Sequence, residues 1–239
     1  MKKFICGMVV FFGIVHSFAA SAADWQGIWC DDAYLRALKN SNSPKAAFAA
    51  SQIPALRVDM GQKTVGMLYQ FHEMPEFTIQ SVDASGVVTL AEPPAEIKSL
   101  VFLENENKIR LEYADYQGEA ITATFTKAAS DSDSENFQQT LDAYLTALVI
   151  SGEYKDDAGQ VYRFDGQNAD WNGKKFQYSI VFDFIEFMPI DMLCETGENG
   201  ICQTMYGFAA RGSVLQIYEY NDDIKRIGTH LFELLKPFE

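Results

Sequence analysis

The sequence predicts a mainly β protein that consists of two tandem antiparallel β-barrels joined by an amphipathic helix. The first observation is a repeated phrase, which reads GIWCDDA at 27–33 and GEYKDDA at 152–158. The second is the alternation of apolar and polar residues through most of the chain, which is typical of antiparallel sheet with one buried face. The third is a shared ending, because IRLEYADY and ITATFTK close the first copy while LQIYEYNDD and GTHLFELLK close the second. The order of these similarities indicates a tandem duplication that has since diverged.

Residues 1–23 have the features of a secretory signal peptide. Lys2 and Lys3 precede an apolar run from Phe4 to about Val15, and small residues follow at 19–23. The apolar run is too short to span a bilayer stably, so we expect a secreted or periplasmic protein without membrane insertion. The other segments expected are a first barrel at 24–128, an acidic linker and helix at 129–150, and a second barrel at 151–239.

The charge of the chain restricts its partners. The formal net charge is −14, and removal of Lys2 and Lys3 with the signal peptide makes it −16. A negative field repels phosphate backbones and anionic lipid head groups, so nucleic acids and membrane surfaces are disfavoured as partners. A cationic protein remains compatible with this charge.

Eight short strands are expected in the first copy. In KIRLEYAD, for example, Ile109, Leu111 and Tyr113 alternate with Arg110 and Glu112. The expected strands lie near 27–30, 55–60, 64–73, 76–82, 87–91, 100–104, 108–114 and 120–127. Eight strands joined by hairpins can close into a barrel, which removes exposed edges.

Helices are expected only before the second strand and between the copies. Asp31 or Asp32 can cap a helix through DAYLRAL, and Ser43 followed by Pro44 is typical of a second helix start. A third helix is expected at about 133–149, where Ser132 and Glu135 form a capping box. Its apolar stripe consists of Phe137, Leu141, Tyr144, Leu145 and Leu148.

The second copy begins at Ser151 and is expected to contain strands but no helices. The segments that read as strands are VYRFDG, KFQYSIVFDFIEF, ICQTMYGFAA, VLQIYEYNDD and IGTHLFELLK. Cys194 and Cys202 bracket ETGENGI, whose glycines suit a reversing loop, so these two cysteines are expected to form a disulfide. Cys30 is then expected to be a free, buried thiol.

Gly27, Ile28 and Trp29 on a first strand resemble the G-x-W opening of the calycin superfamily, which includes lipocalins and fatty-acid-binding proteins. The DDAYLRAL helix, a second short helix and a strand led by Pro54 are similar to the order in fatty-acid-binding proteins. The resemblance covers roughly residues 25–82 and implies a barrel that carries a small apolar ligand beneath two lid helices. ITATFTK lacks the arginine and tyrosine that hold a fatty-acid carboxylate in that family.

This resemblance and the alternation together give a set of candidate ligand-binding residues. The residues expected to line the interior of the first barrel are Trp29, Met67, Tyr69, Phe71, Phe77, Ile109, Leu111 and Phe125. Leu35, Leu38 and Phe48 are expected to cover its mouth as a lid. An eight-stranded barrel can be filled by its own side chains or can hold one small ligand, and the sequence leaves both alternatives open.

No catalytic or metal-binding constellation is recognisable. The pairs Asp31–Asp32 and Asp156–Asp157 suit caps and turns, since neighbours on a strand point to opposite faces and do not act on one substrate. His72 and His230 have no second ligand at metal spacing. We therefore expect a binding protein with no enzymatic activity, cofactor or metal.

Two kinds of binding protein fit the sequence. The first is an exported carrier of a small apolar ligand in a lipocalin-like barrel. The alternative is an acidic module that binds or inhibits a cationic secreted partner. A carrier should retain a ligand in native mass spectra, whereas capture of a basic partner should weaken as salt is added.

Overall fold

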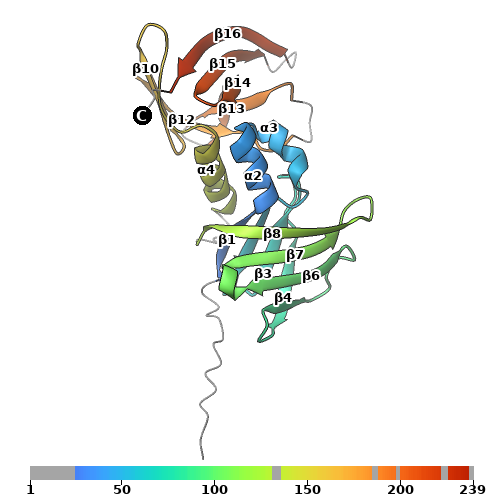
Figure 1. Cartoon of the computed structure of the whole chain (residues 1–239). Coiled ribbons are helices and arrows are strands. Elements are labelled where there is room, and N and C mark those ends of the chain that lie inside the picture. Colours follow the sequence, from blue (N-terminus) through green and yellow to red (C-terminus); the bar gives the residue numbers. More distant parts are fainter. Residues whose placement is uncertain (1–24, 131–135, 185–187, 198–199, 222–225, 237–239) are drawn as a thin grey trace, which may run out of the picture.

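Two closed eight-stranded antiparallel barrels follow one another along the chain, and helices lie between them (Figure 1). This arrangement confirms the predicted fold class. The structure is a computed structural model that describes residues 25–130, 136–184, 188–197, 200–221 and 226–236. The expected signal peptide at 1–23 and the expected capping box of Ser132 and Glu135 lie outside the described residues.

The first barrel contains the eight strands expected for the first copy. These are β1 (Gly27–Asp31), β2 (Ala55–Asp59), β3 (Thr64–Leu68), β4 (Glu76–Val82), β5 (Val87–Leu90), β6 (Ile97–Leu103), β7 (Lys108–Ala114) and β8 (Ala120–Ala129). Each strand pairs with the next, and β8 closes the barrel by pairing with β1 from Ile28↔Ala129 to Asp31↔Phe125. A short 3₁₀ turn, η2 (Glu104–Glu106), connects β6 to β7.

The third strand is shorter than predicted. It ends at Leu68 instead of continuing to residue 73, because Gln70 and Phe71 both have positive φ angles, of 49° and 61°. Two consecutive residues in the left-handed region cannot continue a strand. The backbone N–H of Tyr69 bonds to the carbonyl of Glu73 at 2.7 Å and closes this turn.

The second barrel also has eight strands. These are β9 (Gly152–Lys155), β10 (Val161–Asp165), β11 (Asn168–Trp171), β12 (Lys174–Ile180), β13 (Asp191–Thr196), β14 (Cys202–Arg211), β15 (Val214–Asn221) and β16 (Arg226–Leu235). The sequence analysis missed β11 and β13 and placed the end of β12 seven residues too late. β11 has only four residues, and Asn172 and Gly173 with positive φ return the chain directly into β12.

The helices begin where the cap chemistry predicts. They are α2 (Asp32–Ser41), α3 (Pro44–Ala47), η1 (Phe48–Ala50) and α4 (Phe137–Val149). The Asp31 carboxylate accepts the backbone N–H of Ala33 at 2.9 Å, and the Ser43 hydroxyl accepts that of Ala46 at 3.0 Å. Among the described residues of the second copy no helix is present, as expected.

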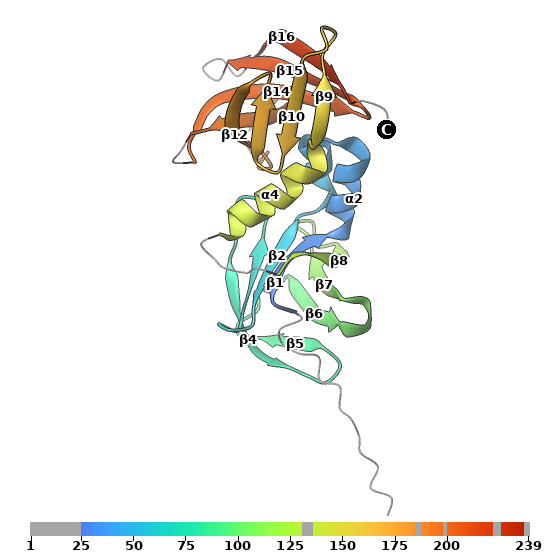
Figure 2. The same ribbon diagram turned by 90° about the vertical axis from the view of Figure 1, so that its left-hand side faces the viewer.

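The apolar residues form two clusters. One is the interior of the first barrel, which includes Trp29, Leu56, Val65, Met67, Ile79, Leu100, Ile109, Leu111 and Phe125. The other joins the outer face of β1, the helices and the interior of the second barrel, and includes Ile28, Tyr34, Leu38, Phe71, Leu141, Leu145, Phe164, Tyr178, Phe208 and Ile217. Figure 2 shows α2 and α4 in the position that this second cluster requires, between the two barrels.

The predicted lid therefore belongs to a different barrel. Leu35 and Leu38 are buried in the cluster that contains the interior of the second barrel, and Phe48 packs against that cluster with its ring 5.8 Å from that of Phe184. None of the three belongs to the interior cluster of the first barrel. The expectation that they cover the first barrel's mouth is wrong, because the apolar face of α2 turns toward the second barrel.

Polar contacts also join the barrels. The Asp191 carboxylate on β13 accepts the backbone N–H of Lys45 at 2.7 Å, at the start of α3. The Lys45 ammonium donates to the carbonyl of Pro189 at 2.8 Å. On the surface, the His72 imidazole lies 2.9 Å from the Asp183 carboxylate, and this hydrogen bond raises the pKa of His72. The two barrels are thus docked by both apolar and polar contacts.

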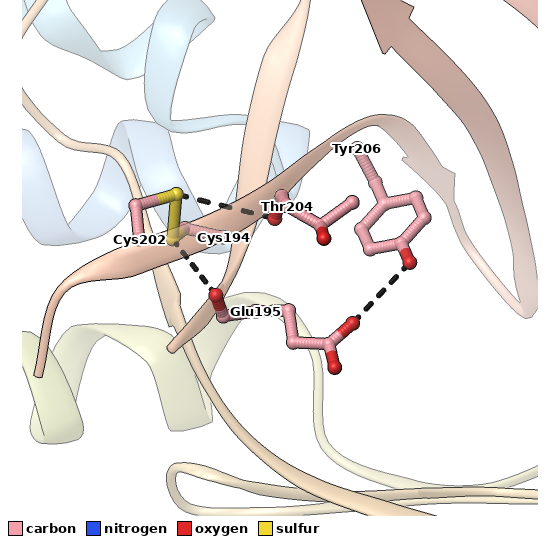
Figure 3. Close-up of a disulfide and its surroundings, with 5 residues drawn as sticks. All are labelled: Cys194, Glu195, Cys202, Thr204 and Tyr206. Atoms are coloured by element: carbon pink, nitrogen blue, oxygen red, sulfur yellow. Dashed lines mark hydrogen bonds between the residues drawn. A yellow bond between two sulfur atoms is a disulfide. The ribbon is translucent and has the colours of Figure 1, made fainter. Parts of the chain in front are cut away.

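The cysteines are as predicted. Cys194 and Cys202 form a disulfide between β13 and β14, and the sulfur of Cys194 lies 3.4 Å from the carbonyl oxygen of Glu195 (Figure 3). Cys30 is free and buried, and burial raises the pKa of its thiol. The disulfide closes a hairpin at the end of the second barrel, so it restrains this loop locally.

Truncation of the buried face of α2 should destabilise the fold. Leu38→Ala leaves a cavity in the cluster shared by the barrels, and we expect the free energy of unfolding to fall by about 2–5 kcal/mol. Urea denaturation measures this loss. Arg36→Ala on the exposed face of the same helix is the control and should change stability little. A small effect of Leu38→Ala would contradict the assigned packing of α2.

The stability of the chain should depend on the ionisation of Asp142. Burial on α4 raises the pKa of this carboxyl from 3.8 to about 7, although the Gln138 amide donates to it at 2.8 Å. Since the folded-state pKa is the higher one, the stabilisation is complete below the unfolded-state pKa and is lost as the pH rises through about 7. Asp142→Asn should therefore stabilise the protein at pH 8 and have little effect at pH 5, as measured by thermal unfolding at both pH values. Equal effects at the two pH values would contradict this assignment.

Candidate functional site

The residues predicted to line the first barrel fall into three groups. Trp29, Met67, Ile109, Leu111 and Phe125 belong to its interior cluster and are at most 1% exposed. Tyr69 and Phe77 are partly buried and pack against that cluster.

Phe71 is the exception, and its assignment to the barrel interior is wrong. The left-handed turn after β3 carries its side chain out of the barrel. Its ring lies 5.1 Å from that of Tyr34 and 5.6 Å from that of Phe182, so it contributes to the docking of the two barrels.

A cavity of about 380 Å³ lies at the end of the first barrel where β3 and β7 finish and β6 begins. Its lining residues are Gln52, Tyr69, Gln70, Glu96, Ala114, Asp115 and Tyr116. We call this cavity the mouth pocket. Its volume is within the range of small-molecule sites. Tyr69 is the one residue of the predicted interior that also lines the mouth pocket.

Backbone hydrogen bonds fix the walls of the mouth pocket. The N–H of Gln70 donates to the carbonyl of Gln52 at 3.0 Å, and the N–H of Ala114 donates to the carbonyl of Glu96 at 2.8 Å. The Asp115 carboxylate accepts the N–H of Glu119 at 2.8 Å within the β7–β8 turn. The pocket is therefore formed before any ligand arrives, which lowers the entropic cost of binding.

The Tyr69 hydroxyl is the least satisfied polar group of the mouth pocket. Its oxygen is buried and has no hydrogen-bond partner among the described residues. Burial, with a smaller contribution from the Glu96 carboxylate, raises the pKa of Tyr69 to about 12. The phenol is thus neutral at ordinary pH and can both donate and accept a hydrogen bond.

The charge and exposure of the rim limit what can enter the pocket. Glu96 and Asp115 are carboxylates, and the lining contains no lysine, arginine or histidine. Tyr116 stands at the rim with 81% of its surface exposed. An anionic ligand would be repelled here, whereas a neutral or cationic ligand with an apolar body would not.

Two other cavities in the described part of the chain have a different character. One, of about 330 Å³, includes Trp25, Trp29, Lys108 and Lys127, and its two cations already have roles. Lys108 pairs with Asp32, and the Lys127 ammonium lies 5.3 Å from the centre of the Trp29 ring. The other, of about 420 Å³, is an open hollow with mostly polar and charged residues on β10, β11 and β12. Neither combines an apolar lining with an unsatisfied buried polar group in the way that the mouth pocket does.

Most of the mouth pocket was missed by sequence reasoning. Gln52, Gln70, Glu96, Asp115 and Tyr116 lie in or beside turns, and the sequence marks turns without showing which of them meet. One signal could have found them. In an up-and-down barrel alternate hairpin turns share an end, so the turns after β3, β5 and β7 must lie together.

Some other kinds of site are absent from the described residues. They contain no group of three or more histidine, cysteine or acidic side chains that could hold a metal ion. The helices within the described ranges are all too short or too polar to cross a membrane.

Removal of the Tyr69 hydroxyl should stabilise the ligand-free protein. A buried hydroxyl without a partner loses its hydration, so Tyr69→Phe should raise the free energy of unfolding by about 1 kcal/mol. Urea denaturation checks this, with Tyr178→Phe as the control. The Tyr178 hydroxyl donates to the carbonyl of Ile150 at 3.2 Å, so its loss should destabilise the protein instead. A loss of stability in Tyr69→Phe would contradict an unsatisfied hydroxyl.

No protein-family model, curated protein or solved structure matches this chain. The resemblance of Gly27, Ile28 and Trp29 to the calycin opening therefore stays an expectation. The function has to be argued from the geometry of the chain itself, and the mouth pocket is the site with the most specific geometry.

Proposed function

We propose that this protein is an exported, non-enzymatic binding protein that holds a small amphipathic ligand in the mouth pocket of the first barrel. The observation that supports the proposal most directly is the buried Tyr69 hydroxyl, which lines the pocket without a partner in the described residues. A ligand with a hydrogen-bonding group at this point would satisfy it. The proposal narrows the carrier hypothesis from the whole barrel interior to its mouth.

The interior packing supports a site at the mouth. Met67 and Phe125 have no exposed surface, and both pack in the middle of the interior cluster. A ligand that reached them would have to displace close-packed side chains, which is costly. A ligand in the mouth pocket needs only to cover Tyr69 and the lining residues around it.

The ligand can be described by its chemistry. The pocket volume of about 380 Å³ suits a small molecule with an apolar body. Tyr69 calls for a hydroxyl, carbonyl, ether or amine group on that body, and Glu96 and Asp115 favour a neutral or positively charged one. A fatty-acid carboxylate fits this environment poorly, in agreement with the absence of its arginine and tyrosine partners from ITATFTK.

A non-enzymatic role is supported by the structural use of the acidic pairs. Asp31 caps α2, and Asp32 accepts the Thr126 hydroxyl at 2.6 Å and pairs with Lys108. Asp156 accepts the backbone N–H groups of Ala158 and Gln160 in its turn. Export is supported by the signal-peptide pattern and by a disulfide, since disulfides persist in oxidising compartments.

Binding of matched dyes tests the proposal. Three environment-sensitive dyes share one apolar body and carry a neutral, a cationic or an anionic polar group. We expect the neutral and cationic dyes to bind the mature protein and the anionic dye to bind at least about ten-fold more weakly. Tyr69→Phe should weaken binding by about 2- to 10-fold, the value of one neutral hydrogen bond.

Two controls make the result specific. Tyr144→Phe removes a hydroxyl on α4, away from the pocket, and should leave dye binding unchanged. Tyr116→Ala opens the rim and should speed dye release. If none of the dyes binds, or if Tyr144→Phe and Tyr69→Phe have equal effects, the mouth pocket is not a ligand site.

A further inference from the structure

The last strand of the second barrel has a free edge over most of its length. β16 pairs with β15 along Val214–Asn221, but its pairing with β9 consists of Leu235↔Lys155 alone. The part of the chain that the structure describes provides no other strand beside residues 227–233. Figures 1 and 2 both show β16 at the outside of this barrel, with β15 on one side. The backbone N–H and C=O groups of this edge are available to another strand.

This edge is apolar as well as unpaired. Ile227, Leu231 and Leu235 are 40%, 36% and 45% exposed, and they recur along β16 at intervals of four residues. Natural edge strands are usually protected by charges or bulges. β16 has shifts in register beside Ile217/Tyr218 and Tyr218/Tyr220, which bend it, but its exposed apolar residues remain.

A carboxylate lies across the backbone of the free strand. A Cβ atom built on Gly228 would stand 3.0 Å from the Cβ of Glu219 and 3.2 Å from its carboxylate oxygen. Glu219 therefore extends from β15 over Gly228, where the absence of a side chain leaves room for it. Glu219 is exposed, and no cation of the described residues pairs with it. Ile227 precedes Gly228, so it lies on the opposite face of the strand.

We propose that β16 binds an extended segment of a basic partner protein, which adds to the barrel as a further strand along residues 227–233. The partner segment alternates basic and apolar residues. Its lysine or arginine opposite Gly228 pairs with Glu219, and its apolar side chains on the other face cover Ile227. Backbone hydrogen bonds provide affinity, and the alternation provides specificity.

Charge complementarity favours this occupant over a second copy of the chain. The net charge of −14 makes two copies repel each other and attracts a cationic segment. The site is separate from the mouth pocket, because it lies on the second barrel and uses a strand edge rather than a cavity. It therefore stands or fails independently of the proposed ligand binding.

Hydrogen exchange and peptide binding test this proposal on the mature chain. The probe is a nine-residue peptide of alternating lysine and valine. We expect it to bind, to slow amide exchange at residues 227–233, and to bind more weakly as salt is added. A peptide of alternating glutamate and valine should not bind.

Variants of the peptide and of the protein separate strand addition from simple charge attraction. Peptides that are N-methylated only at lysine or only at valine lose hydrogen bonding at opposite edges, so one should bind at least about ten-fold more weakly and the other should bind as before. Glu219→Gln should weaken binding by about 2- to 5-fold, as expected for one exposed ion pair. Glu106→Gln, an exposed carboxylate on the first barrel, is the matched control and should have no effect.

Three outcomes would overturn the proposal. The first is binding without slowed exchange at residues 227–233. The second is equal binding of both N-methylated peptides, or equal weakening by Glu219→Gln and Glu106→Gln, which indicates non-specific attraction. The third is self-association of the free chain in sedimentation experiments with protection of the same amides, which assigns the edge to a second copy.

Discussion

The burial of α2 and α4 between the barrels is the contact on which the rest of the molecule depends. One apolar cluster extends from the outer face of β1 through Tyr34 and Leu38 to Phe164 and Tyr178 inside the second barrel. Apolar burial contributes roughly 25 cal/mol per Å² removed from water, so a shared cluster of this extent is strongly stabilising. Because it continues from one barrel into the next, the two copies form one structural unit rather than two beads on a string.

The duplication has given its two copies different roles. The first copy has α2 and α3 after its first strand, and the second has none. The helices of the first copy pack into the end of the second barrel, and Asp191 of the second copy accepts a hydrogen bond from the start of α3. The second barrel is therefore closed at the end that faces the first. This use of the helices leaves the mouth pocket of the first barrel without the lid that its resemblance to fatty-acid-binding proteins implies.

The parts of the fold that depend on local patterns could be predicted from the sequence. Alternation located all eight strands of the first barrel, and Ser43 and Pro44 located the start of α3, because both signals act over a few residues. The direction of α2 could not be predicted, since its apolar face suits either barrel and only the assembled chain decides between them. Phe71 was misplaced because nothing in the local pattern shows that two consecutive residues adopt positive φ. The mouth pocket was missed for a similar reason, because its residues come from turns that are distant in sequence.

Tyr69 and Glu219 have one property in common that separates them from the other polar groups considered. Asp31, Asp32, Asp156 and Asp191 each accept hydrogen bonds that hold a helix, a strand or a turn, so the fold explains them. The hydroxyl of Tyr69 and the carboxylate of Glu219 hold nothing in the described chain. Selection for stability alone would replace a buried hydroxyl without a partner by phenylalanine and would cover or charge an apolar strand edge. The retention of both features is therefore more easily explained by binding, and the two sites differ enough in shape to serve a small molecule and an extended peptide respectively.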